Sequence, residues 1–123
     1  MEMKRVETFT LNKRKFVYID ISRIRSNSEF KEFVAGIKEY FKDFKPQSVY
    51  TITNVEGITF DSATKDIVED LLISDSEYVI YAAVINIDGI KKIMFNSVIK
   101  ASKRDNIRFF NTRQQAVEWL SEV

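Results

Sequence analysis

The side chains of this chain that could do chemistry are carboxylates, hydroxyls and amides, because the sequence contains no histidine and no cysteine. An imidazole base, a thiolate nucleophile, a haem ligand and the usual structural zinc site are therefore excluded. Only oxygen ligands remain for a metal ion, and Asp20, Asp61 and Asp88 are the acids that could converge. Asp61 and Asp88 also stand where helix caps are expected, which explains them without catalysis. We expect no catalytic residue, no metal site and no cofactor.

Phosphate-binding loops are excluded by glycine spacing. Gly36, Gly57 and Gly89 are too far apart to form a P-loop or a dinucleotide fingerprint. A response-regulator receiver would need a lysine where Asn111 stands and one further strand–helix unit. Nucleic-acid binding would depend on the basic residues 100–108, but the net charge of +1 is balanced and the neighbouring phenylalanines fit a buried strand. The sequence disfavours these three classes.

Alternating strand and helix patterns must position any site. Runs over 6–11 and 16–21 flank a polar turn and predict an antiparallel hairpin. Further strands are expected over 48–53, 78–85 and 107–110, and the run 78–85 is apolar on both parities, as in a strand covered on two faces. The strands alternate with helical patterns, which indicates right-handed crossovers and a mostly parallel sheet.

Four helices are expected between and after these strands. The first follows a capping box at Ser26–Glu29 and ends before Pro46, and the last opens with a second box at Thr112–Gln115. The others are expected over 61–73 and 88–102. The apolar residues expected to face inward are Phe30, Phe33, Val34, Ile37, Phe41 and Phe44; Ala63, Ile67 and Leu71; Ile90, Ile93, Met94, Val98 and Ala101; and Ala116, Trp119, Leu120 and Val123. We predict one α/β domain over residues 1–123: a mostly parallel sheet with an N-terminal antiparallel strand and four helices.

Polar residues follow the predicted parallel strands. Ligands of open α/β sheets bind beyond the carboxyl ends of the strands, where Asn54, Asn86, Asp88 and Asn111 stand. Asn86, Asp88 and Asn111 are therefore candidates for a ligand rim. The alternative is that they are ordinary turn and cap residues.

Charge is unevenly distributed along the chain. Residues 55–77 carry seven acids and one base, whereas residues 91–113 carry seven bases and one acid. Solvated helix faces explain such blocks. The alternative is a pair of surfaces of opposite sign that attract partners or a second copy.

The cellular compartment is predicted from three features that the sequence lacks. The first seven residues contain no apolar stretch typical of a signal peptide, and the apolar run 79–85 is far shorter than the ~20 residues of a transmembrane helix. No disulfide can form without cysteine. We expect a cytoplasmic protein without a transmembrane segment.

Three stretches together resemble the STAS family (sulfate transporter and anti-sigma-factor antagonist domains), in particular its SpoIIAA-like branch of small bacterial proteins. The segment 48–63 resembles the family's strand and the loop that ends in Asp-Ser-Ser-Gly, here Asp61-Ser62-Ala63-Thr64. The segment 78–92 resembles the strand that leads into a Gly-hydrophobe-basic helix. The segment 106–120 is similar to the terminal strand and Ala-x-x-Trp-Leu helix.

The resemblance implies a non-enzymatic regulatory domain that binds a protein partner, such as an anti-sigma factor or a kinase. In the antagonists a serine at the start of the second helix is phosphorylated, and Ser62 matches it, although Ala63 and Thr64 depart from the pattern. The candidate binding face combines the loop after the strand 48–53 with the acidic helix that follows. Its candidate residues are Asn54, Glu56, Gly57, Asp61, Ser62, Asp66 and Glu69.

The fold of this branch also resembles lipid-transfer domains of the SEC14 type. The alternative function is therefore a carrier or sensor of a small apolar ligand, held between helices and sheet. Ten phenylalanines and three methionines could line such a pocket, although residues of these types are usually core.

Overall fold

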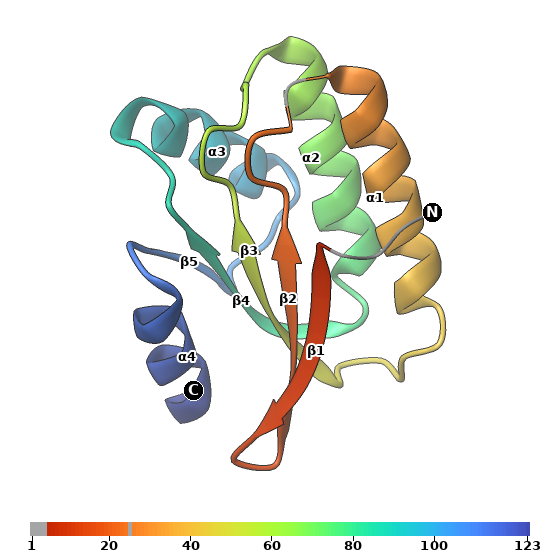
Figure 1. Ribbon diagram of the computed structural model, residues 1–123, viewed down its shortest axis with the longest axis vertical. Helices are drawn as coiled ribbons and strands as arrows, with labels where there is room; N and C mark the ends of the chain where they lie inside the picture. The colour runs from red at the N-terminus through yellow and green to blue at the C-terminus, as the bar shows by residue number, and fades with distance from the viewer. Residues whose placement is uncertain (1–4, 25) are drawn as a thin grey trace.

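The computed structural model describes residues 5–24 and 26–123 (Figure 1). Residues 1–4 lie outside the described part, so the expectation about a signal peptide is not addressed by it. Along the chain the elements are β1 (Val6–Leu11), β2 (Arg14–Asp20), α1 (Asn27–Phe41), β3 (Val49–Asn54), α2 (Ser62–Asp75), β4 (Val79–Ile85), α3 (Gly89–Ala101), β5 (Ile107–Phe110) and α4 (Arg113–Glu122).

All five strands form one sheet in the order β1-β2-β3-β4-β5. β1 pairs antiparallel with β2, and every other pair is parallel, as the sequence predicted. Since the parallel strands step in one direction across the sheet, right-handed crossovers place α1, α2 and α3 on one face. α4 covers the opposite face of the sheet, on the side away from α1 and α2 (Figure 1).

The hairpin turn is shorter than predicted. Asn12 and Lys13 have φ values of 52° and 65°, so a two-residue turn joins the strands and β2 begins at Arg14 rather than at residue 16. Turns with two positive φ values match the right-handed twist of a hairpin, and asparagine tolerates them well.

The sheet separates two apolar cores. Between the sheet and α1–α3 lie the inward residues of α1 together with one parity of β2 and β4, while Phe16, Ile52, Ala83 and Leu120 lie on the α4 side. β4 is buried on both parities, which confirms the prediction of a strand covered on two faces.

The N-cap hydrogen bond of both predicted capping boxes is present, whereas the Gln115 side chain accepts from the amide of Asn111 and not from that of the N-cap Thr112. The Ser26 hydroxyl accepts from the Glu29 amide at 3.3 Å, and the Thr112 hydroxyl accepts from the Gln115 amide at 3.1 Å. α1 ends at Phe41, so Phe44 lies beyond it but still packs against the core. In the described part of the chain, no helix combines the length and the apolar character that crossing a bilayer requires.

Two predicted helix faces differ from the structure: α2 at Ala63 only, since Ile67 and Leu71 are buried as predicted, and α3 along most of its stripe. In α2, Ala63 is exposed and Thr64 is buried instead, because the Thr64 hydroxyl is hydrogen-bonded within the protein. In α3 the inward residues are Phe95, Val98 and Ile99, so Val98 is the one residue of the predicted stripe that is buried.

The α3 error has a physical cause. Apart from one polar stripe of Lys92, Asn96 and Lys100, apolar residues cover most of this helix, so sequence periodicity does not decide which of them face the sheet. The aromatic ring of Phe95 decides which side faces inward, because it packs against Phe60 and Phe109 at centroid distances of 5.8 and 5.9 Å. Ile90 and Ile93 are left on the outside.

Candidate partner-binding site

The carboxyl ends of β3 and β4 meet through their asparagines. The Asn86 side-chain amide donates to the Asn54 side-chain oxygen at 3.1 Å, and the same oxygen accepts from the Glu56 amide at 3.1 Å. Asn86 has a φ of 64°, a conformation that asparagine adopts more readily than most residues. These two predicted site residues therefore lie together, and their amides hold the loop after β3 in place.

The loops after β2 and β3 are tied to each other. The Arg23 amide donates to the Glu56 carbonyl oxygen at 2.8 Å, and the Arg23 guanidinium pairs with the Glu56 carboxylate at 3.0 Å. Val55 and Ile58 are each 1% exposed and anchor the loop in the core. The loop is thus fixed at both its backbone and its apolar side chains.

Gly57 is required by the loop backbone. Its φ is +69°, and a Cβ built there would lie 3.4 Å from Cγ of Arg23. We predict that Gly57→Ala lowers the free energy of unfolding by about 1–2 kcal/mol, because an L-residue pays that much in the left-handed region. Gly89→Ala is the matched control, since nothing lies within 4 Å of its Cβ position and its φ is not positive. Chemical denaturation that finds equal effects for the two variants would contradict this assignment.

The start of α2 is held by a polar cluster. The Asp61 carboxylate accepts from the Thr64 amide at 2.9 Å and from the Thr64 hydroxyl at 3.0 Å. The same hydroxyl lies 3.1 Å from the side-chain oxygen of Asn27 in α1. The hydrogen bond from the Thr64 amide, followed by that from its hydroxyl, lowers the pKa of Asp61. Ser62 is exposed beside this cluster.

The remaining rim candidates have local roles. The Asp88 carboxylate accepts from the Lys91 amide at 3.0 Å, and this hydrogen bond is the main reason that the pKa of Asp88 is lowered. The Asn111 amide donates to the Gln115 side chain at 3.1 Å. Both contacts belong to helix starts, which supports the alternative reading of these residues as turn and cap residues.

The three aspartates singled out for chemistry do not form a metal site. Asp20 accepts from the Ser22 amide at 2.9 Å, while Asp61 and Asp88 cap different helices. Across residues 5–24 and 26–123, no three acids are grouped so that they could hold a metal ion.

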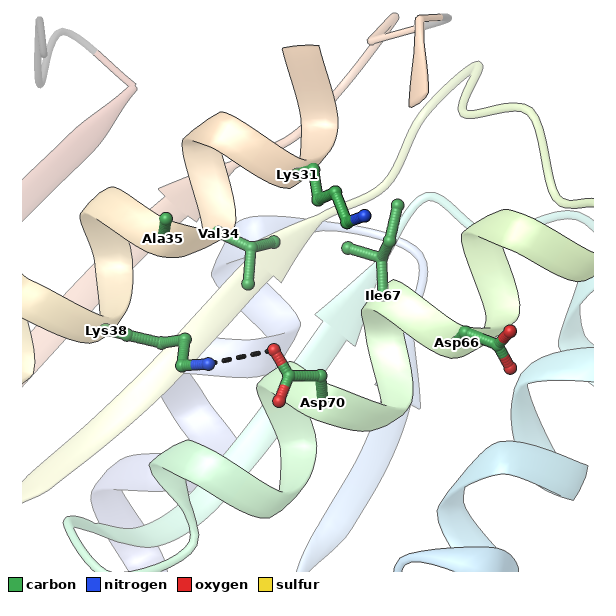
Figure 2. Close-up of a pocket in the computed structure, with 7 residues that line it drawn as sticks. All are labelled: Lys31, Val34, Ala35, Lys38, Asp66, Ile67 and Asp70. Carbon is green, nitrogen blue, oxygen red and sulfur yellow. Dashed lines mark hydrogen bonds and ion pairs between the residues drawn. The ribbon is translucent and has the colours of Figure 1, made fainter. Parts of the chain in front are cut away.

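Asp66 lies on a groove between α1 and α2 (Figure 2). The groove has a volume of about 370 Å³ and an apolar floor of Val34, Ala35 and Ile67. Lys31 and Lys38 of α1 and Asp66 and Asp70 of α2 form its walls, and the Lys38 ammonium pairs with Asp70 at 2.9 Å. Sequence reasoning missed the two lysines as site residues, because only packing places α1 beside α2.

Several basic residues of the segment 91–113 contact other residues of this chain. They are therefore less available to a partner than the sequence suggests. Arg104 pairs with the buried Asp75 at 2.8 Å, and Arg113 pairs with Glu7 at 3.1 Å and lies over the Tyr18 ring. Arg108 lies over the Trp119 ring. The exposed acids of α2 and the lysines near the end of α3 are what remains of the two predicted surfaces of opposite sign.

The Asp75–Arg104 pair was also missed, although a signal existed. Asp75 follows Leu71 by four residues and therefore belongs to the inward stripe of α2. Asp75 is 7% exposed. Burial raises the pKa of Asp75 to about 6, although the charge of Arg104 acts in the opposite direction. One guanidinium nitrogen of Arg104, Nη2, is buried without a hydrogen-bond partner.

Comparison with known proteins bears on the fold of this chain. No protein-family model and no curated protein sequence matches the chain. Among solved structures, the chain is similar to that of an uncharacterised protein of the DUF3478 family from Shewanella loihica PV-4, described as having a SpoIIAA-like fold. The match has a TM-score of 0.66 and 8% sequence identity, and it covers 94% of this chain and 91% of the other. This chain has a SpoIIAA-like fold. The predicted fold class is thus confirmed.

The SpoIIAA-like fold of this chain leaves little room for an apolar ligand at its centre. The space between the sheet, α2 and α3 has a volume of about 30 Å³, near that of one water molecule. Pockets that enclose drug-sized ligands have volumes of roughly 300–1,000 Å³. This interior space therefore gives no support to the alternative of a lipid carrier.

Proposed function

We propose that this chain is a non-enzymatic regulatory module that acts in the cytoplasm by binding a protein partner. Its binding face comprises the loop after β3, the outer side of α2 and the groove between α1 and α2. The observation that carries the proposal is the pair of acids Asp66 and Glu69 on the outer side of α2. This helix follows the loop that is hydrogen-bonded through Asn54 and Glu56 and turns at Gly57. A surface that is fixed before binding loses little conformational entropy on association.

The proposed partner is basic and presents an apolar side chain. Asp66 is exposed and Glu69 is half-buried on α2, so they can pair with lysine or arginine of a partner. The apolar floor beside Asp66 is wide enough, at about 370 Å³, to take a leucine- or methionine-sized side chain. An anti-sigma factor or a kinase is the partner class that the family resemblance implies.

Charge reversal tests this face. The chain is used as bait in extracts of its source cells, with chemical cross-linking and mass spectrometry to identify captured proteins. We expect Asp66→Lys with Glu69→Lys to reduce capture about 10-fold or more, because like charges then oppose the partner. The matched control is Glu32→Lys with Glu39→Lys, which reverses two exposed acids seven residues apart on α1. Equal capture by both variants, or capture of nothing by the wild type, would contradict the proposal.

Phosphorylation of Ser62 would switch this face. A phosphate there would lie at a helix N-terminus, which favours it, but next to the Asp61 carboxylate, which opposes it. Mass spectrometry of the chain isolated from its own cells tests the switch. A Ser62 that is never modified would remove it and leave the binding proposal standing.

A further inference from the structure

β1 forms one edge of the sheet (Figure 1). In the order β1-β2-β3-β4-β5 the two edge strands are β1 and β5, and β1 is the longer of them, with six residues against four. Within residues 5–24 and 26–123, no strand pairs with the outer side of β1. A free edge presents backbone N–H and C=O groups on which another strand can pair.

The pairing of β1 with β2 determines which backbone groups face outward. Leu11 is opposite Arg14 across the two-residue turn, and the Asp20 amide donates to the Arg5 carbonyl oxygen at 2.7 Å. In an antiparallel pair, residues that exchange hydrogen bonds with the partner strand alternate with residues that point both groups away from it. Every second residue from Arg5 to Leu11 therefore bonds to β2. The residues that point both groups outward are Val6, Thr8 and Thr10.

β1 lacks the sequence features that commonly protect a sheet edge. Native edge strands are often protected by proline, by lysine or by a β-bulge. β1 contains no proline and no lysine, and its register with β2 is regular from Val6 to Leu11. Four of its six residues are exposed. The outer side of this strand is therefore open to a partner of matching backbone geometry.

We propose that two copies of this chain associate by antiparallel pairing of their β1 strands, about a two-fold axis at Thr8. The three outward residues are evenly spaced about Thr8, so the second copy places Thr8 opposite Thr8 and Val6 opposite Thr10. Every outward N–H and C=O of these residues then has a partner in a single register. The two five-stranded sheets become one continuous sheet.

The charged side chains near this join favour a second copy over an unrelated strand. The Arg113 guanidinium pairs with Glu7 at 3.1 Å and lies 5.1 Å from the ring centre of Phe9. In the proposed register Glu7 of the second copy stands opposite Phe9, beside the ring that Arg113 covers. Each guanidinium then lies between two carboxylates, one from each copy. No like charges stand directly opposite each other between Arg5 and Leu11.

Sedimentation equilibrium of the purified chain tests whether the copies associate. We expect a mass approaching twice the 14.4 kDa of the chain as its concentration rises. Thr8→Pro should weaken this association about 10-fold or more, because it removes the central outward N–H of each copy and leaves the bonds to β2 in place. An edge strand accepts proline where its nitrogen faces away from the sheet.

Thr8→Val is the matched control. It loses the hydrogen bond between the Thr8 and Tyr40 hydroxyls but keeps the backbone N–H, so its association should equal that of the wild type. Circular dichroism and thermal melting check that both variants fold. A chain that stays monomeric at several hundred micromolar, or equal association of folded Thr8→Pro and the wild type, would overturn the proposal.

Amide hydrogen exchange of the wild type locates the contact without any variant. The outward amides of Val6, Thr8 and Thr10 should exchange freely in dilute protein and slow about 10-fold or more once the chain is dimeric. The amides of Glu7 and Phe9 bond to β2, so they should be slow at both concentrations.

Two results of the exchange experiment would overturn the pairing. A dimer in which the three outward amides still exchange freely would show that the copies meet elsewhere on the surface. Slow exchange of these amides in a chain that sediments as a monomer would show that another part of the same chain covers the edge. Both experiments use the isolated chain, so their failure leaves the proposed partner binding untouched.

Discussion

Arg104→Met should lower the free energy of unfolding by about 3–5 kcal/mol at pH 8, because it leaves the Asp75 carboxylate buried without its counter-charge. The two side chains are 6% and 10% exposed and are joined by a 2.8 Å hydrogen bond. The same guanidinium donates to the Leu72 carbonyl oxygen at 2.8 Å near the end of α2. Loss of Arg104 therefore also releases the end of this helix from the loop after α3.

The effect of this variant should depend on pH in a defined direction. In the wild type, burial raises the pKa of Asp75 to about 6, above the value of about 3.9 in an unfolded chain. The folded protein then binds the extra proton, so the contribution of Asp75 to stability is fully present below about pH 4 and falls as pH rises to about 6. Without Arg104 the pKa should rise further. The defect of Arg104→Met should therefore be largest at pH 8 and smaller at pH 5.

Urea denaturation at pH 5, 6.5 and 8 measures this dependence. The double variant Arg104→Met with Asp75→Asn is the control, since it removes both charges and should restore part of the lost stability at pH 8. A defect of Arg104→Met that is the same at pH 5 and pH 8 would show that the buried charge of Asp75 is not its cause.

Phe41→Ala should be equally severe, with an expected loss of about 3–5 kcal/mol in the free energy of unfolding. Phe41 is 1% exposed and fixes the last turn of α1 to the sheet. Its ring stacks on Tyr78 at 5.8 Å and meets the Phe44 ring edge-on at 5.4 Å. Removal of this ring leaves a cavity that these neighbours can fill only in part.

Two further variants make this a specific test. Phe41→Leu keeps most of the volume and should lose less than about 1.5 kcal/mol. Phe44→Ala removes a ring of the same size that is only half-buried, so its loss should be clearly smaller. Guanidinium denaturation that finds Phe44→Ala as damaging as Phe41→Ala would contradict the role given to Phe41.

Most of the architecture could be predicted from the sequence because its signals are local. The caps at Ser26 and Thr112 act on amides three residues away, and the run 79–85 is apolar on both parities wherever it lies. Asn54 and Asn86 were expected together, since neighbouring parallel strands end at the same edge of a sheet.

The rotation of a helix about its own axis was not predictable where apolar residues cover most of its circumference, as in α3. The α3 sequence offers two apolar stripes, and only the Phe60 and Phe109 rings beside Phe95 decide which one faces inward. The same packing leaves Ile90 and Ile93 outside. The exposure of these two isoleucines is thus a product of tertiary structure.

The amino-acid sequence alone determined the strand and helix order, the helix starts and the absence of histidine and cysteine chemistry, since these depend on composition and on neighbours along the chain. Only the tertiary structure decided that Asp75 meets Arg104, twenty-nine residues later in the chain, and that Lys38 meets Asp70 across a groove. Such contacts depend on how elements dock. Docking is set by the fit of many side chains at once, which no local pattern encodes.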